Sequence, residues 1–233
     1  MRKVSFMLVT LLLACIVSGC GPSLKEYFAN TQNYYSRVTA IDHVNVWIEP
    51  AQLPSASKST TYGKIASTVN TASTVASYAI RTDQKERLQT LVVPQELAHH
   101  IESSFNAAFS AQTQLQVVSE SYRNPDFRIL LSIEEYGLRA ESIGSAMTFY
   151  LRSQIRVVHV ASMTTIYTRE LEIERAASDY PQLNSMISDI VGAAFNLTYF
   201  FMLSDEDVIT IFHIMGEDAG TMMAQRLVDD IYQ

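Results

Sequence analysis

Two pairs of adjacent side chains have the residue types of a metal or catalytic site, His99 with His100 and Glu134 with Glu135. Neighbouring residues on a helix point about 100° apart, so His99 and His100 are not expected to bind the same metal ion. Glu134 and Glu135 lie in a segment with strand periodicity, in which neighbours point to opposite faces of a sheet. These two carboxylates are therefore not expected to work as an acid and base pair.

The other histidines and the common nucleophile motifs give no stronger candidate. His43 alternates with apolar residues along a predicted strand, and His159 and His213 have no acid or cysteine at ligand spacing. The chain contains no G-x-S-x-G motif, no phosphate-binding loop and no G-x-G-x-x-G motif. We therefore expect no catalytic residue, no metal and no bound cofactor, which predicts a protein that is not an enzyme.

A row of three acids follows one face of a later predicted strand. The acids recur at every second position, so their carboxylates share one face of the sheet. We expect them to form solvent-exposed ion pairs with Arg152 or Arg156, each contributing roughly 1 kcal/mol or less. The row consists of Glu170, Glu172 and Glu174.

The first twenty residues have the order of an export signal. Arg2 and Lys3 precede an apolar run that is too short to span a bilayer comfortably. The run closes with Val17-Ser18-Gly19-Cys20, which resembles the lipobox of bacterial lipoproteins. In that family the chain is cut before the cysteine, which then carries acyl chains such as palmitate. The resemblance implies a signal peptide over residues 1–19 and lipidation at Cys20.

Two alternatives to this assignment stay open. Cys15 is a weaker competitor for the lipid, because Leu13 is bulky beside the cut, and an ordinary signal peptide with incidental cysteines is the other alternative. The resemblance also implies that the residue after the lipidated cysteine directs sorting, and this chain has Gly21 rather than Asp at that position. We therefore expect a lipid-anchored protein of the cell envelope, at the outer membrane and facing the periplasm.

The composition predicts a folded domain without disulfide bonds. The chain has 2 cysteines, both within the export segment, so the rest of the chain has no disulfide and no cysteine metal site. About 214 residues remain from Cys20 on, which is enough for one domain. Loss of Arg2 and Lys3 changes the formal net charge from -7 to -9, because 15 basic residues then face 24 acidic ones. Such an acidic protein is not expected to bind nucleic acid.

The periodicity of the chain after Cys20 predicts an α+β domain. Residues 20–40 are expected to hold the lipidated cysteine and a tether, and residues 41–233 a single periplasmic domain. Alternation of apolar and polar residues predicts a half-buried strand over 41–48. Residues 64–80, rich in Ser, Thr and Ala, predict a thin helix that lies on its own sheet or docks on a partner.

The middle of the chain predicts a helix followed by a meander of strands. The last two strands are expected to form one hairpin centred on Ser162, since a single register agrees on both faces of the sheet. That register pairs Leu151 with Ile173, Val157 with Tyr167 and Arg152 with Glu172. The predicted elements are a helix from Pro94 to Phe109, a short strand over 115–118, and strands over 127–136, 148–160 and 164–174.

The C-terminal third predicts helices. Residues 183–203 are long enough to cross a membrane, but a mid-bilayer acid such as Asp189 costs roughly 3 kcal/mol, so core or interface packing is expected. Ser204, followed by three acids, predicts the N-cap of an amphipathic helix that runs to Ile231. The element order predicts a mainly antiparallel sheet of about five strands, with helices packed on one face and C-terminal helices.

The layout resembles the ABC-type transport auxiliary lipoproteins, which assist lipid transport between envelope membranes. The apolar region 183–215 departs from that family's pattern. The resemblance covers about residues 17–175 and is carried by the lipobox Val17-Ser18-Gly19-Cys20, the strand Val44-Asn45-Val46-Trp47-Ile48-Glu49-Pro50, the helix from Pro94 to Phe109, and the strand Asp126-Phe127-Arg128-Ile129-Leu130-Leu131 leading to Tyr136.

Two classes of function are therefore expected. The first is a membrane-anchored periplasmic lipoprotein that acts as a non-enzymatic accessory or adaptor in envelope assembly or lipid transport. Its partners would be the membrane, through the lipid on Cys20, and envelope proteins, with a lipid as a candidate ligand. The alternative is a structural component of a secretion or surface complex, with residues 64–80 and 183–203 as assembly surfaces.

Overall fold

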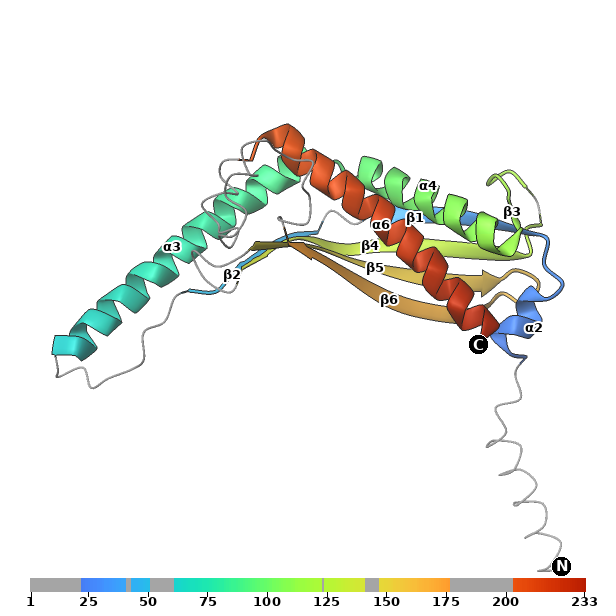
Figure 1. The fold of residues 1–233 in the computed structure, drawn as a ribbon, viewed down its shortest axis with the longest axis horizontal. Helices are drawn as coiled ribbons and strands as arrows, with labels where there is room; N and C mark the ends of the chain where they lie inside the picture. The colour runs from blue at the N-terminus through green and yellow to red at the C-terminus, as the bar shows by residue number, and fades with distance from the viewer. Residues whose placement is uncertain (1–21, 41–42, 51–60, 123, 141–146, 177–202) are drawn as a thin grey trace, which may run out of the picture.

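The computed structural model describes residues 22–40, 43–50, 61–122, 124–140, 147–176 and 203–233. The strands form one six-stranded mixed sheet, and α4 and α6 lie over one of its faces (Figure 1). The elements follow the order α2 (Leu24–Phe28), β1 (Asn33–Ala40), β2 (Val44–Ile48), α3 (Thr61–Leu91), α4 (Pro94–Thr113), β3 (Gln116–Val117), β4 (Phe127–Ala140), β5 (Met147–His159), β6 (Thr164–Ala176) and α6 (Asp205–Tyr232).

One half of the sheet is the predicted antiparallel meander, and the other half is parallel. Strands β4, β5 and β6 pair antiparallel, and the predicted register is confirmed, with Leu151 opposite Ile173 and Arg152 opposite Glu172. Strands β1 and β2 follow one another along the free side of β4, both parallel to it, and β3 pairs briefly with the outer edge of β1. The prediction of about five mainly antiparallel strands missed this parallel part, because parallel partners lie far apart in the sequence.

Residues 24–40 belong to the fold, although a tether was expected over residues 20–40. Helix α2 begins with a capping box, in which the Glu26 carboxylate accepts from the Ser23 N–H at 2.7 Å. Strand β1 pairs with β4, and its Tyr34 is fully buried. The strand gives a weak sequence pattern because Ser36 occupies an inward position, where its hydroxyl donates to Glu102 at 3.1 Å.

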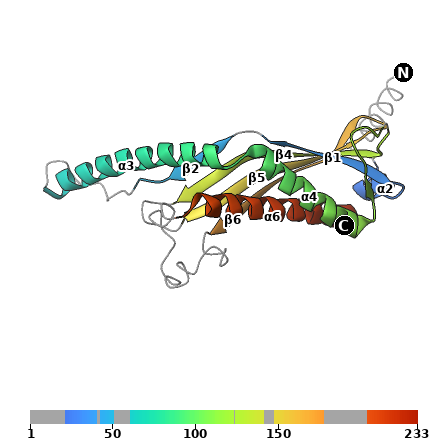
Figure 2. The same cartoon turned by 90° about the horizontal axis from the view of Figure 1, so that it is seen from above.

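Helices α4 and α6 form a layer over the sheet and run side by side in the same direction (Figure 2). Two glycines allow their close approach: a Cβ at Gly220 would lie 2.3 Å from the Ile101 carbonyl oxygen, and one at Gly216 would lie 2.9 Å from Leu97 Cδ1. The predicted N-cap is confirmed, because the Ser204 hydroxyl accepts from the Asp207 N–H at 3.1 Å. The predicted helix from Pro94 is also confirmed, and it buries Leu97, Ile101, Phe105 and Phe109.

The predicted thin helix is part of the longer α3, which has two unlike halves. The second half is fixed to the body, because Leu88 is fully buried and the Arg81 guanidinium donates to the Ile48 carbonyl of β2. Arg87 connects the same half to the chain before α6, donating to the Leu203 carbonyl at 2.8 Å. The first half, which holds most of residues 64–80, extends beyond the end of the sheet (Figures 1 and 2).

Within the described ranges, no helix combines the length and the apolar character that a membrane crossing requires. The predicted packing segment 183–203 lies outside the described residues, apart from Leu203, which is buried. Its placement in the core or at an interface therefore stays a prediction.

Candidate functional site

The predicted lipidation site adjoins one end of the molecule. Cys20 lies outside the described residues, but Pro22 is described, and two residues span at most roughly 7 Å. Pro22 leads into α2, which lies at the opposite end of the molecule from the start of α3 (Figure 1). A lipid on Cys20 would therefore hold the α2 end of the molecule close to a membrane surface.

The α2 end is joined to the packed body by aromatic contacts and by one carboxylate. Phe28 stacks on Phe127 with 4.4 Å between ring centroids, and it meets Phe109 edge-on at 6.2 Å. The Asp126 carboxylate accepts from the N–H of Asn33 at 3.2 Å, at the point where β1 begins beside β4. The end that adjoins the predicted lipid is therefore continuous with the hydrophobic core.

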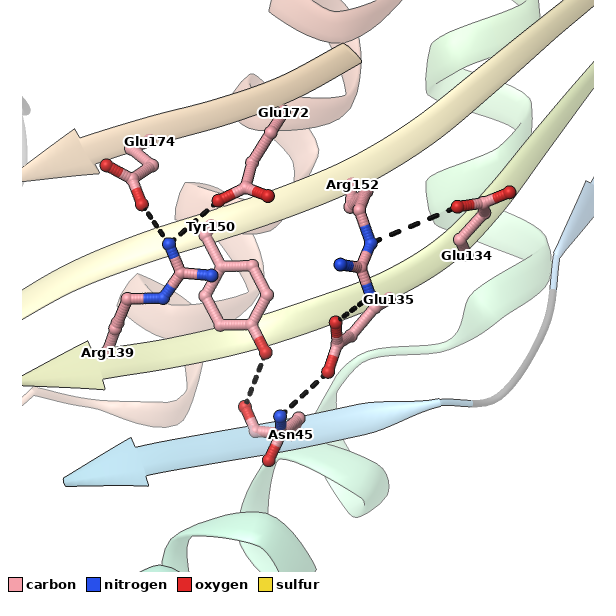
Figure 3. A network of polar contacts seen from close by, with 8 residues as sticks. All are labelled: Asn45, Glu134, Glu135, Arg139, Tyr150, Arg152, Glu172 and Glu174. Carbon is pink, nitrogen blue, oxygen red and sulfur yellow. Dashed lines mark hydrogen bonds and ion pairs between the residues drawn. The ribbon is translucent and has the colours of Figure 1, made fainter. Parts of the chain in front are cut away.

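A network of polar side chains connects β2, β4 and β5 on the sheet face opposite α4 and α6 (Figure 3). A β-bulge between Ile133 and Glu135 places the Glu135 side chain in this network, where it is 8% exposed. Asn45 Nδ2 donates to one oxygen of Glu135 at 2.7 Å, and the Arg152 guanidinium pairs with the other. Burial raises the pKa of Glu135, but the Asn45 hydrogen bond and the Arg152 charge outweigh it and hold the pKa below its ordinary value.

Tyr150 and Arg139 extend the network toward β6 (Figure 3). The Tyr150 hydroxyl donates to the Asn45 carbonyl at 3.3 Å, and the Arg139 guanidinium lies 4.5 Å from the centroid of the tyrosine ring. Arg139 also pairs with Glu172 at 2.7 Å and with Glu174. Burial raises the pKa of Tyr150 well above its ordinary value, and the negative charge of Glu135 raises it further. This phenol therefore stays protonated and acts as a hydrogen-bond donor.

Gly137 explains how β2 reaches this network. It pairs with Tyr150 across β4 and β5, and a Cβ at this position would lie 1.7 Å from the Asn45 carbonyl oxygen. A side chain at residue 137 would therefore displace β2 from β4 and remove Asn45 from Glu135.

Two sequence predictions about these acids were wrong. Glu134 and Glu135 do not point to opposite faces, because the bulge brings both toward Arg152, with Glu134 at 3.9 Å from its Nε. Glu172 and Glu174 pair with Arg139 rather than with Arg152 or Arg156, because β4 carries Arg139 to the same face. Both oxygens of Glu135 are engaged, so the network joins strands and offers no open acid and base pair.

His100 packs against His213 of α6 rather than against its sequence neighbour His99. The rings of His99 and His100 have centroids 6.3 Å apart at 68°, whereas His100 stacks on His213 of α6 at 4.2 Å and 24°. His100 Nδ1 lies 3.2 Å from Glu217, and His213 Nε2 lies 3.6 Å from Glu96. Burial and the neighbouring His100 lower the pKa of His213, against the opposing effect of Glu96.

Because the His100 and His213 rings are stacked face to face, their in-plane nitrogen lone pairs lie in separate, nearly parallel planes and do not converge on one ion. In the part of the chain that the structure describes, no group of three His, Cys, Asp or Glu side chains is placed to hold a metal. The stacked pair His100 and His213 therefore joins α4 to α6 and shows no ligand geometry.

The first half of α3 offers a different kind of surface. No charged residue occurs between Lys64 and Arg81, and the side chains of Val75 and Tyr78 are 65% and 72% exposed. Ser77 in the same segment is 1% exposed, so one side of the segment is covered while Val75 and Tyr78 face solvent. We call this segment, residues 65–80, the α3 arm.

Comparisons with known proteins give structural likenesses only. No protein-family model matches the chain, and no curated protein matches its sequence. The structure is similar to protein XCC0632 from Xanthomonas campestris, of the family DUF330, with 10% identity, 86% of this chain and 85% of that chain covered, and a TM-score of 0.43.

Two further solved structures align with a large share of their own length. The lipoprotein GNA1162 from Neisseria meningitidis has 14% identity, with 69% of this chain and 95% of that chain covered and a TM-score of 0.27. The hypothetical protein CT253 from Chlamydia trachomatis has 10% identity, with 78% and 96% covered and a TM-score of 0.33. A lipoprotein is thus among the similar structures, but likenesses this low bring neither a family nor a function to this chain.

Proposed function

We propose that the protein is a lipid-anchored lipoprotein of the bacterial envelope that acts as a non-enzymatic accessory or adaptor in envelope assembly or lipid transport. The lipobox residues Val17-Ser18-Gly19-Cys20 support the anchor. One structural observation supports the adaptor: helix α2, which begins four residues after Cys20, and the first half of α3 lie at opposite ends of the molecule (Figure 1). Anchored at the α2 end, the protein would present an uncharged helical segment with exposed Val75 and Tyr78 away from the membrane.

The anchor is tested by metabolic labelling with a fatty acid in a bacterium that processes lipoproteins. Cys20→Ser is expected to abolish labelling and to release the protein from membranes, whereas the matched variant Cys15→Ser is expected to retain both. Labelling that survives in Cys20→Ser, or that disappears only in Cys15→Ser, would show that the lipid is attached elsewhere.

The adaptor function is tested by photo-crosslinking in living cells. A photoreactive amino acid at Tyr78 of the α3 arm is expected to give a crosslink to an envelope protein, because Tyr78 is 72% exposed on this uncharged segment. The control position is Met163, which is equally exposed at 70%, but lies in the turn between β5 and β6. No crosslink from Tyr78, or the same products from both positions, would argue against the α3 arm as a docking surface.

A second candidate is a structural component of a secretion or surface complex. The observation that favours it is the absence of charge along residues 65–80, since an uncharged helix does not repel copies of itself. The mass of the protein after gentle solubilisation separates the two proposals. A large ring or self-assembled particle supports the structural component, and a complex with other envelope subunits supports the adaptor.

A further inference from the structure

The two edges of the sheet differ in how they meet solvent. The edge at β6 carries five charged side chains among its 13 residues, an arrangement that discourages other strands from pairing with it. On the opposite edge, Arg37 is the one charged residue of strand β1. Strand β3 pairs with β1 at Asn33 and Tyr34 only, so β1 continues beyond the end of its neighbour.

The direction of the backbone groups on β1 follows from the hydrogen bonds at its start. The Tyr34 carbonyl accepts from the N–H of Val118 at 2.9 Å, so the backbone groups of Tyr34 face the β3 side. The N–H and C=O groups of successive residues point to opposite sides of a strand, and β1 pairs with β4 without a break. The backbone groups of Val38 and Ala40, four and six residues after Tyr34, therefore also point toward the β3 side, away from β4. Among the described residues, none forms a backbone hydrogen bond with this part of the edge.

A groove of about 430 Å³ runs beside this open edge. One wall is the strand itself, from Arg37 to Ala40, and the other wall is α4. The residues that α4 contributes are Gln95, Ala98, His99 and Glu102. The groove therefore combines unpaired backbone donors and acceptors on one side with a helix on the other, which is the arrangement that receives an added peptide strand.

We propose that this groove binds an extended peptide segment of a partner protein, which adds to the sheet as a strand along β1. Main-chain hydrogen bonds to Val38 and Ala40 supply the affinity, and side chains at alternate positions of the peptide supply the specificity. Side chains on one side meet Ala98, where a small or apolar group fits. Those on the other side meet Arg37, whose side chain is 61% exposed and already pairs with Glu120 at 3.6 Å, so an uncharged polar residue fits there.

This inference rests on the proposed adaptor function in one respect, that the protein binds another protein, and it is independent of Cys20 acylation. The test uses the full mature lipoprotein in lipid nanodiscs and a display library of random twelve-residue peptides, with empty nanodiscs to remove lipid binders. Enriched peptides are synthesised with a fluorescent label, and their affinity is measured by anisotropy.

Three variants identify where the peptides bind. Val38→Pro removes the outward N–H of an edge strand, where proline is tolerated, and Val38→Ala keeps that N–H. Ala98→Phe fills the groove from the α4 side without changing β1. At least tenfold weaker binding is expected for Val38→Pro and Ala98→Phe, and less than threefold weaker binding for Val38→Ala. Thermal unfolding of each variant shows whether it is folded. If Val38→Pro does not fold, binding to Ala98→Phe decides whether the peptides occupy the groove.

Hydrogen exchange gives a second readout that is specific to strand addition. A bound peptide is expected to slow exchange of the Val38 and Ala40 amide protons, while exchange along the β6 edge stays unchanged. The inference is overturned if no peptide is enriched, or if enriched peptides bind Ala98→Phe and wild type equally. If Tyr78 gives no crosslink but peptides bind the groove, the α3 arm is not the docking surface and the proposal for the groove still holds.

Discussion

The helical layer and the α3 arm are both helical, but opposite features hold them in place. In the layer, Phe212 of α6 is fully buried and meets the rings of Tyr136 and Phe149 edge-on, at 5.5 and 5.7 Å. In the arm, Tyr78 is 72% exposed. The layer is fixed along its length by apolar packing, whereas the described part of the arm buries Ser77 and exposes Val75 and Tyr78. After the arm, Leu88 of α3 is buried and Arg87 reaches Asp205 at 2.8 Å.

The difference separates stability from recognition. A helix packed like α6 makes the fold, and changes in it act on the free energy of unfolding. A helix exposed like the α3 arm contributes little to that free energy, so changes in it are expected to act on binding. Paired substitutions in the two regions test this separation.

The largest difference is expected from removing one aromatic ring in each region. Phe212→Ala leaves a cavity between the sheet and α6 and is expected to lower the free energy of unfolding by about 3–5 kcal/mol. Tyr78→Ala removes a ring that stands in solvent, and its effect is expected within about 0.5 kcal/mol. Urea denaturation of both variants measures the contrast. A loss above about 2 kcal/mol for Tyr78→Ala would show that the arm is packed rather than exposed.

A smaller effect is expected where α6 touches α4. Gly220→Ala places a methyl group against the Ile101 carbonyl and the Phe105 N–H, both backbone groups, and is expected to cost about 1–3 kcal/mol. Gly216→Ala meets the Leu97 side chain, which can move, so its cost is expected to be lower. Thermal unfolding ranks the two variants. The reverse order, or equal midpoints, would mean that the backbones of α4 and α6 separate easily.

Much of this architecture is visible in the sequence, because the signals are local. The alternation along 148–160 and 164–174 predicts the hairpin register of β5 and β6 correctly, and Ser204 before three acids predicts the start of α6. The spacing of Gly216 and Gly220 was a further local signal, since two small residues four apart on a helix face allow close packing, but it gave no prediction.

The parts that sequence reasoning missed depend on distant neighbours. The pairing of β1 with β4 joins residues about 90 positions apart, and the bulge at Glu135 becomes meaningful only once Asn45 and Arg152 are beside it. The peptide groove needs α4 against β1, which no periodicity reveals. The predicted lipidation at Cys20 rests on the sequence alone and stays a prediction.

In the polar network of β2, β4 and β5, loss of the Glu135 charge is expected to lower the free energy of unfolding by about 1 kcal/mol. The pKa of Glu135 is held below its ordinary value in the folded state, so its contribution is present above the ordinary glutamate range and is lost as the pH falls through the folded pKa. Glu135→Gln is therefore expected to be less stable than wild type at neutral pH and equal to it in strong acid. Urea unfolding over a pH series measures this.

Glu134→Gln is the matched control for that series, because Glu134 is more exposed and lies farther from Arg152, at 3.9 Å. Its expected effect is smaller at every pH. A stability difference for Glu135→Gln that does not change with pH would mean that packing, and not charge, is responsible.

The smallest effect is expected at the surface of the helical layer. The pKa of His213 is lowered in the folded state, so the stability that its neutral ring allows is full above the ordinary histidine pKa of about 6.5 and is lost as the pH falls through the folded value. His213→Gln is expected to be less sensitive to mild acid, by roughly 0.5 kcal/mol or less. Melting temperatures at neutral and mildly acidic pH test this, with His99→Gln as the exposed control. Equal acid sensitivity of His213→Gln and wild type would contradict it.

The parallel pairing of β1 with β4 also sets the order in which an emerging chain can fold. Asp126, which fixes the start of β1, follows Asn33 by 93 residues, so an emerging chain carries β1 and β2 for a long interval before their partner arrives. Contacts between such distant residues make folding slow, and unpaired strands aggregate meanwhile. A folding helper that shields residues 33–48 during this interval is therefore expected to raise the yield of folded protein.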